Sequence, residues 1–171
     1  MITLDMARAI ARHHVQSMGA NLTLLAKPIS WGDYGWVFSY QSKAFLKTGH
    51  PSDALAGNAP LLIDREQGHV ITLGTAEALD VYLENYVRFG DPHAVPGPSL
   101  ELSGWQAGAD KVAATKALKA HTQLGLKDAK ATIDMCLAGQ KPVVSCAAPE
   151  TAEILVGKLV DLGFSARQLA Q

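Results

Sequence analysis

AGNAPLLIDREQGHVITLG, residues 56–74, is the stretch that organises the first half of the chain. Residues 59–63 form an apolar run, residues 64–68 carry turn-forming side chains, and residues 69–73 form a second run rich in β-branched side chains. Two such runs joined by a short turn predict a β-hairpin. Gly68 can adopt the positive φ that a short connection requires. We therefore expect this hairpin to form the centre of a first domain.

The residues around the hairpin predict two helices and further strands. A helix is expected to start near Thr3 or Asp5 and to run to about Met18, and Thr75 is expected to cap a second helix. Between the first helix and the hairpin, loose or strong alternation predicts strands. Their expected positions are 21–29 and 34–40, joined by a turn at 28–32, and then a short strand or irregular edge within 42–49.

Residues 89–98, FGDPHAVPGP, mark a domain boundary, because three prolines and two glycines in ten residues pack poorly. We expect a first domain over 1–90, a linker over 91–98 and a second domain over 99–171. Periodicity and glycines predict the order β-α-α-β-α-β for the second domain. Its expected elements are a strand at 99–104, a helix from Asp110 broken at Leu124 to Leu126, a helix ending at Gly139, a strand at 142–146, a helix from Pro149 or Glu150 to Leu162, and a strand at 164–170.

The predicted fold class is thus α+β, with an N-terminal α-β-meander-α domain built on the hairpin and a small second domain. With 171 residues, of which 48% are hydrophobic, and a net charge of -1, the chain can bury a core and lacks a broad basic footprint for nucleic acid. No apolar run approaches the roughly 20 residues that span a bilayer, and the first residues do not resemble a secretory signal. We expect a cytoplasmic protein.

No residue pattern indicates catalysis, a cofactor or a metal. The six histidines include no pair four residues apart, and no phosphate-binding glycine loop occurs. Cys136 and Cys146 fall on predicted apolar faces, where we expect reduced thiols rather than nucleophiles. Asp64 and Glu66 are explained more simply by turn formation than by a carboxylate pair. We expect a binding protein and not an enzyme.

Residues 110–134, DKVAATKALKAHTQLGLKDAKATID, resemble the C-terminal domain of the bacterial ribosomal stalk protein. The resemblance is carried by the Lys-Val-Ala start of one helix and the Gly-Leu-Lys-Asp-Ala-Lys start of the next. In that family the domain docks translation GTPases through these two helices. The resemblance implies partner-binding roles for the matching positions, which are Lys111, Val112, Lys116, Lys119, Gly125, Leu126, Lys127 and Lys130.

The first half, from about Ile2 to Gly90, resembles the YrhB-like immunity family of polymorphic toxin systems. The resemblance is carried by Trp-Val-Phe at 36–38, the block at 55–76, and LDVYLENY at 79–86. Family members are small α+β proteins, and those in toxin loci are predicted to protect a bacterium from its own or a kindred toxin. The resemblance implies a monomeric immunity protein that binds a cognate toxin one to one, in a setting of interbacterial competition such as type VI secretion.

Two features of the first half are candidate surfaces for that toxin. The first is an aromatic cluster in which strand alternation makes half of the rings core and leaves the others as partner anchors: Trp31, Tyr34 and Trp36, with Asp33 among them. The second is an acidic helix face, which is either simply solvated or electrostatically matched to a basic toxin cleft, as in a nuclease: Glu77, Asp80 and Glu84.

Two other functions stay open. The chain is alternatively a translation-associated adaptor that recruits a GTPase through Lys116, Lys119 and the turn at Gly125 and Leu126. It is otherwise a small chaperone-like stress protein that uses an exposed apolar patch near residues 31–36. Binding of elongation factors would indicate the first, and broad suppression of client aggregation would indicate the second.

Overall fold

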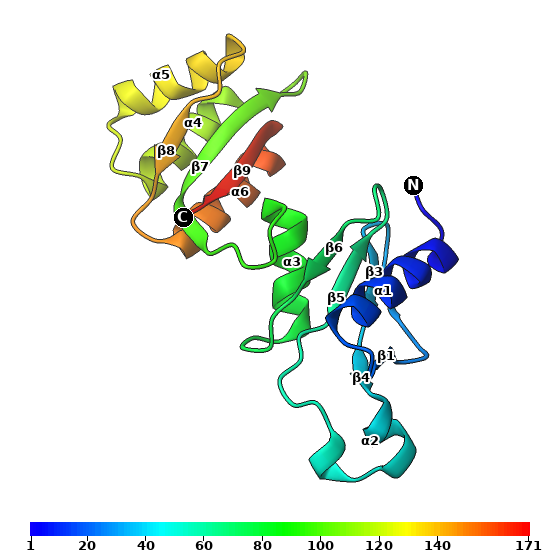
Figure 1. Ribbon diagram of the computed structural model, residues 1–171. Helices are drawn as coiled ribbons and strands as arrows, with labels where there is room; N and C mark the ends of the chain where they lie inside the picture. Colours follow the sequence, from blue (N-terminus) through cyan, green and yellow to red (C-terminus); the bar gives the residue numbers. More distant parts are fainter. The chain divides into compact units, whose positions relative to one another are not determined.

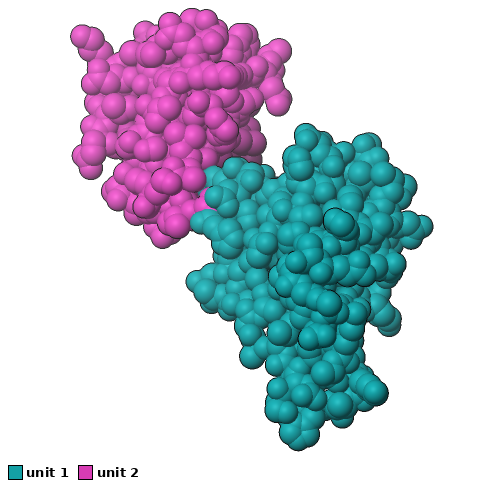
Figure 2. All heavy atoms as spheres, viewed as in Figure 1, with its two compact units in different colours: residues 1–93 teal, residues 94–171 magenta.

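The computed structural model describes residues 1–171, and the chain forms two compact units, Met1–His93 and Ala94–Gln171 (Figure 2). Each unit contains helices and antiparallel strands (Figure 1), which confirms the α+β class. None of the helices combines the length and the apolar character that a membrane crossing demands.

Unit 1 is built on an antiparallel four-stranded sheet in the order β2-β3-β5-β6. The predicted hairpin is confirmed, because β5 pairs with β6 from Leu61 opposite Thr72 to Ile63 opposite Val70. A second sheet contains only β1 and β4. The elements of unit 1 are α1 (Leu4–Met18), β1 (Leu22–Leu24), β2 (Ile29–Trp31), β3 (Gly35–Phe38), β4 (Tyr40–Ser42), α2 (Lys43–Thr48), a 3₁₀ turn η1 (Pro51–Asp53), β5 (Leu61–Asp64), β6 (Val70–Thr72) and α3 (Leu79–Phe89).

The turn of the hairpin is organised by the Asp64 carboxylate. Its two oxygens accept hydrogen bonds from the backbone N–H groups of Glu66 at 3.0 Å, Gln67 at 2.8 Å and His69 at 2.5 Å. Gly68 has φ +77°, and a Cβ there would lie 2.8 Å from a methyl carbon of Ile10. The turn therefore requires a carboxylate at its start and a glycine at its end.

Helices cover both faces of the four-stranded sheet. Alternation along β3 sends Trp36 and Phe38 to the face that packs against Ala7 and Ala11 of α1. Val37 belongs to the other face, where the packed residues come from β5, the segment after β6, and α3: Leu62, Leu73, Tyr82 and Leu83. Every residue of β3 and β5 is consequently buried.

Three expectations for unit 1 are corrected. The segment within 42–49 is not a strand: residues 43–48 form α2, because the Ser42 hydroxyl accepts a hydrogen bond from Phe45 N–H at 3.0 Å and so caps a helix. The turn between β2 and β3 lies at 32–34 and not at 28–32. Thr75 caps no helix, since α3 begins at Leu79 after Ala78, which makes no side-chain cap.

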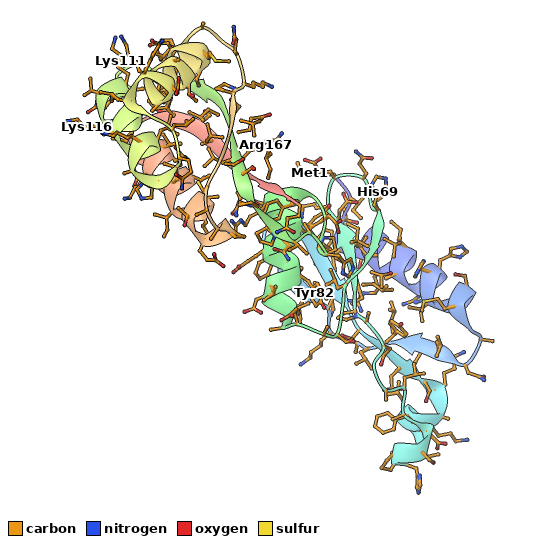
Figure 3. All side chains as sticks on the ribbon, turned by 90° about the vertical axis from the view of Figure 1, so that its left-hand side faces the viewer. Met1, His69, Tyr82, Lys111, Lys116 and Arg167 are labelled. Carbon is orange, nitrogen blue, oxygen red and sulfur yellow. The ribbon has the colours of Figure 1, made fainter.

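A tyrosine of α3 fixes the loop that precedes the helix. The Tyr82 hydroxyl oxygen accepts hydrogen bonds from the backbone N–H groups of Ala76 at 3.2 Å and Glu77 at 3.1 Å, so it holds the loop before α3 (Figure 3). A Cβ at Gly74 would lie 2.0 Å from the same hydroxyl oxygen. The close approach of the ring to the chain at residue 74 thus requires glycine.

Unit 2 has the predicted order β-α-α-β-α-β, with helices packed on a sheet ordered β8-β7-β9. Its elements are β7 (Pro96–Trp105), α4 (Lys111–His121), α5 (Leu126–Leu137), β8 (Val143–Ser145), α6 (Pro149–Asp161) and β9 (Phe164–Ala170). The central strand begins at Pro96, which pairs with Ala170, so residues 96–98 of the expected linker belong to the sheet. Gly97 permits this, because a Cβ there would lie 2.8 Å from the Leu169 carbonyl oxygen.

Candidate partner-binding surfaces

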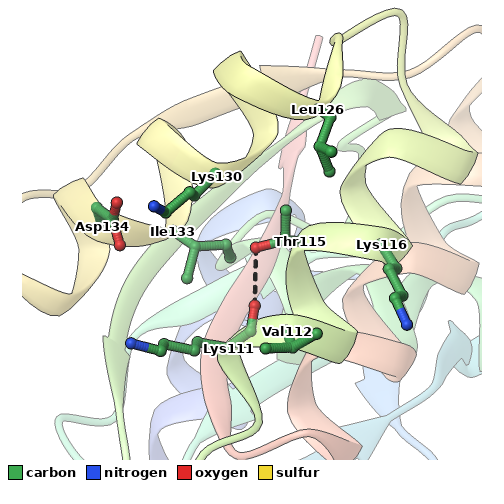
Figure 4. A pocket seen from close by; sticks show the side chains of 8 residues that line it. All are labelled: Lys111, Val112, Thr115, Lys116, Leu126, Lys130, Ile133 and Asp134. Atoms are coloured by element: carbon green, nitrogen blue, oxygen red, sulfur yellow. Dashed lines mark hydrogen bonds between the residues drawn. The ribbon is translucent and has the colours of Figure 1, made fainter.

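An apolar groove lies between α4 and α5 of unit 2 (Figure 4). Its volume is about 320 Å³. We call it the α4–α5 groove, and its lining residues are Lys111, Val112, Thr115, Lys116, Leu126, Lys130, Ile133 and Asp134.

The local sequence explains why the two helices form these walls. Asp110 caps α4, since its carboxylate accepts hydrogen bonds from the backbone N–H groups of Val112 at 3.0 Å and Ala113 at 2.9 Å. Gly125 is the N-cap residue of α5. The inward faces of both helices are buried in the core of unit 2, with Ala114, Leu118, Ala129 and Ile133 at most 1% exposed.

The walls of the groove are apolar and its rim is basic. Val112 and Leu126 each keep 58% of their surface exposed, although both are large apolar side chains. The Thr115 hydroxyl donates to the Lys111 carbonyl oxygen at 2.7 Å, so this polar group is already satisfied within the helix. Three lysines and one aspartate line the groove, and Lys111 and Lys116 both lie on α4 (Figure 3). The arrangement can hold an apolar side chain beside an acidic one.

The structure brings five of the eight stalk-like positions together in this groove. Lys111, Val112, Lys116, Leu126 and Lys130 line it. The other three predicted positions are exposed on the same helices or their junction but do not line it: Lys119, Gly125 and Lys127. Thr115, Ile133 and Asp134 also line the groove but were not predicted, although helical spacing from Val112 and Lys130 would have found them.

The aromatic cluster of unit 1 divides between core and surface. Trp36 is only 6% exposed, and the guanidinium of Arg65 lies 4.7 Å from its ring centroid. Its ring is therefore not an exposed anchor. Trp31 is half-buried in β2, whereas Tyr34 is 47% exposed. The Asp33 carboxylate is fully exposed and forms an ion pair with Arg65 at 3.3 Å.

The expected acidic helix face is smaller than predicted. Asp80 and Glu84 are exposed and lie four residues apart on α3, which places them on one face. Glu77 is also exposed, but it precedes the helix and belongs to the loop that Tyr82 holds. The correction follows from the late start of α3 at Leu79.

A second cavity, in unit 1, has a different chemistry. Its volume is about 420 Å³, and the turn between β2 and β3, the turn between β5 and β6, and the end of α3 line it. We call it the tyrosine cavity, and its lining residues are Asp33, Tyr34, Asp64, Glu66, Tyr86, Val87 and Gly90. Burial raises the pKa of Tyr86, and the charges of Asp64 and then Glu66 raise it further. Sequence reasoning found only Asp33 and Tyr34 of this set.

Both cysteines are free thiols in unit 2. Cys136 is buried, and its thiol donates to the Gly104 carbonyl oxygen at 3.5 Å, whereas Cys146 is half-buried. Burial raises the pKa of both thiols, and for Cys136 the hydrogen bond to Gly104 opposes part of that effect. Raised pKa values keep thiols protonated at neutral pH, which disfavours nucleophilic chemistry.

Comparison with known proteins identifies the first unit. Residues 5–89 match the family model described as immunity protein 35. The chain is also 38% identical over 86 residues to the uncharacterized protein YrhB of Escherichia coli strain K12, an alignment that covers 50% of this chain and 89% of that protein. The chain belongs to the immunity protein 35 family. In this immunity protein 35 member, residues 101–167 also match the family model described as the ribosomal protein L7/L12 C-terminal domain.

Both resemblances found in the sequence are thereby confirmed at the level of the family. No solved structure is significantly similar to the chain.

Proposed function

We propose that this immunity protein 35 member binds a cognate secreted bacterial toxin and neutralises it by stoichiometric contact. The observation that carries the proposal is the match of residues 5–89 to the immunity family, because those residues include the whole four-stranded sheet of unit 1. The protein acts in the cytoplasm as a monomer in a one-to-one complex, and it inhibits by binding rather than by catalysis.

The exposed chemistry of unit 1 favours a toxin with a basic surface, such as a nuclease. Asp80 and Glu84 project from one face of α3, and Asp33 and Glu66 line the tyrosine cavity. Carboxylates fixed on a folded unit attract a basic partner and accelerate its association. The delivery of the toxin between competing cells, including by type VI secretion, belongs to the same proposal.

The test is protection followed by a measurement of stoichiometry. The toxin domain encoded beside this gene is expressed in Escherichia coli with and without the full chain, and the purified pair is titrated by calorimetry. Restored growth together with one-to-one binding supports the proposal. YrhB is a matched control, because it shares the family but differs at most aligned positions, and we expect it not to protect. Growth arrest of cells that express the full chain in an amount equal to the toxin domain would refute the proposal.

The α4–α5 groove supports a second candidate function, recruitment of a translation GTPase. The observation behind it is that five positions matching the stalk domain motif converge on one apolar groove with a lysine rim. The variant Val112→Ser with Lys116→Glu changes the wall and the rim, whereas Lys141→Glu makes the same charge change at an exposed lysine outside the groove and outside the stalk-like motif. If the first variant loses an elongation factor that the wild type and Lys141→Glu retain, the adaptor function holds. If the wild type retains no such factor, it fails.

A further inference from the structure

The tyrosine cavity is assembled from three segments that lie apart in the sequence. Asp33 and Tyr34 come from the turn between β2 and β3, and Glu66 comes from the hairpin turn. Tyr86 and Gly90 come from the last turn and the cap of α3. The backbone joins the two turns directly, because Arg65 N–H donates to the Tyr34 carbonyl oxygen at 2.9 Å. The cavity is therefore part of the folded sheet and not a gap between loose loops.

The charge of the lining is negative throughout. Three carboxylates line the cavity and no basic side chain does. The cation Arg65 lies nearby but does not line the cavity: its guanidinium lies over Trp36 and also forms the ion pair with the Asp33 carboxylate at 3.3 Å. Asp64 is 6% exposed and its oxygens already hold three backbone N–H groups, so its role is structural. Glu66 is exposed, and Asp33 is fully exposed and held only by a surface ion pair with Arg65, which contributes little, so both carboxylates are accessible to a ligand.

The end of α3 adds to this negative potential independently of the carboxylates. Val87 and Gly90 of the lining belong to the C-terminal turn and cap of an 11-residue helix, where the backbone carbonyl groups carry the negative end of the helix dipole. Gly90 has a left-handed backbone with φ +76°, and its N–H donates to the backbone carbonyl oxygen of Tyr86 at 2.8 Å. A cation is favoured at such a helix end.

Two tyrosine rings complete the lining. Tyr34 is 47% exposed and Tyr86 is half-buried. Aromatic faces attract cations, and guanidinium groups in particular stack on them. Lysine and arginine also have apolar stems that pack along aromatic surface while the charged head reaches carboxylates. Rings beside carboxylates thus fit a long cationic side chain better than they fit a small inorganic cation.

We infer that the tyrosine cavity receives a lysine or arginine side chain of the partner protein, with Asp33 and Glu66 pairing the charge and Tyr34 and Tyr86 packing on the stem. The inference rests on the proposed function, in that the partner is the toxin. It specifies where on unit 1 the contact is anchored and by which chemistry. Trp36 contributes nothing directly, because it is buried on the other face.

The first test uses a probe that does not require the toxin. N-acetyl-arginine N-methylamide is titrated into the isotope-labelled full chain, and the backbone amide NMR shifts of Tyr34, Glu66 and Gly90 are followed. We expect saturable shifts at these amides with the arginine probe, and none with the uncharged citrulline analogue. Equal shifts with both probes, or no shift with either, overturn the inference.

Matched variants localise the binding. Asp33→Asn with Glu66→Gln removes two charges at the cavity, and we expect it to weaken binding of the arginine probe about tenfold, because each exposed charge pair contributes modestly. Asp80→Asn with Glu84→Gln removes two charges from α3 outside the cavity, and we expect it to leave the affinity unchanged. Equal weakening by both pairs of substitutions would show general electrostatic attraction only and overturn the inference.

Measurements of toxin binding distinguish a failure of this inference from a failure of the proposed function. We expect the cavity variant to bind the toxin about tenfold more weakly than the wild type does, with a salt dependence that is also reduced. If the cavity variant binds the toxin as tightly as the wild type, the inference is overturned and the proposed function stands. If the wild type binds no toxin while the arginine probe saturates the cavity, the proposed function fails, and the partner assigned to the cavity fails with it.

Discussion

Substitution of Gly35 by alanine tests the central strand pair of unit 1. Gly35 lies opposite Asp64 where β3 pairs with β5, and it is buried. Its φ is +153°, and a Cβ built on it would lie 2.2 Å from the Ile63 carbonyl oxygen. That oxygen belongs to the backbone of the neighbouring strand and cannot rotate away, so the two strands must separate locally.

The cost follows from two contributions. Carbon and oxygen approach to about 3.3 Å in close contacts between strands, so the ladder must open by about 1 Å at this point. Losing one or two backbone hydrogen bonds costs about 1 kcal/mol each. The unfavourable φ adds about 1 kcal/mol or more for a residue with a Cβ. We therefore expect Gly35→Ala to lower the free energy of unfolding of unit 1 by about 3 kcal/mol.

Gly57→Ala is the matched control. Gly57 also has a positive φ, at +72°, but a Cβ there would meet nothing within 4 Å. It should cost only about 1 kcal/mol. Hydrogen exchange followed by mass spectrometry measures both variants, and Gly35→Ala should reduce the protection of the β3 and β5 amides by roughly 100-fold. Peptides from residues 94–171 should keep wild-type protection. A loss no larger than that in Gly57→Ala would refute the reasoning.

Three further predictions follow from single contacts. Tyr82→Phe should lower the free energy of unfolding by about 1–2 kcal/mol in urea titrations, because two backbone N–H groups lose their acceptor; an unchanged midpoint and slope would contradict it. Asp110→Ala should cost about 1 kcal/mol through loss of the α4 cap, with Asp128→Ala as a carboxylate control outside that cap. Iodoacetamide should label Cys136 and Cys146 more slowly in the native protein than in the urea-unfolded chain, because their raised pKa values reduce the thiolate fraction at neutral pH. The labelling rates should rise with pH, and equal rates in the two states would contradict burial of the thiols.

Local patterns were sufficient for the elements that contain their own start and stop signals. The hairpin at 56–74 consists of an apolar run and a β-branched run, and its turn holds Asp64 and Gly68, while α1 lies between the Thr3 cap and Gly19. The order of unit 2 followed in the same way from helical spacing closed by glycines, including Gly139 and Gly163. These signals act within a few residues, so the sequence displays them directly.

Other features depend on contacts that the sequence does not display. The start of α3 was misplaced because Tyr82, and not a residue before the helix, satisfies the N–H groups at 76 and 77. Alternation predicted that half of the rings around Trp36 are core and left the others as partner anchors, but helices cover both faces of the sheet here. The alternation of side chains along a strand does not by itself tell whether a face of the sheet is covered by a helix or exposed to solvent.

Each candidate surface was predicted only in part from the sequence. The stalk-like motif located five residues of the α4–α5 groove, since motif and groove share two consecutive helices. The tyrosine cavity was found only in part, because Glu66 and Tyr86 reach Tyr34 through the pairing of β3 with β5 and the packing of α3 on the sheet.

The most direct test of the central claim, toxin neutralisation by contact, is capture of the tagged full chain from its native cell. Mass spectrometry then identifies and quantifies what stays bound after a wash in high salt. The account predicts one dominant partner, a large protein with a C-terminal toxin domain, present in equal amount with the chain. Elongation factors or ribosomes in its place would contradict the account and assign the function to unit 2.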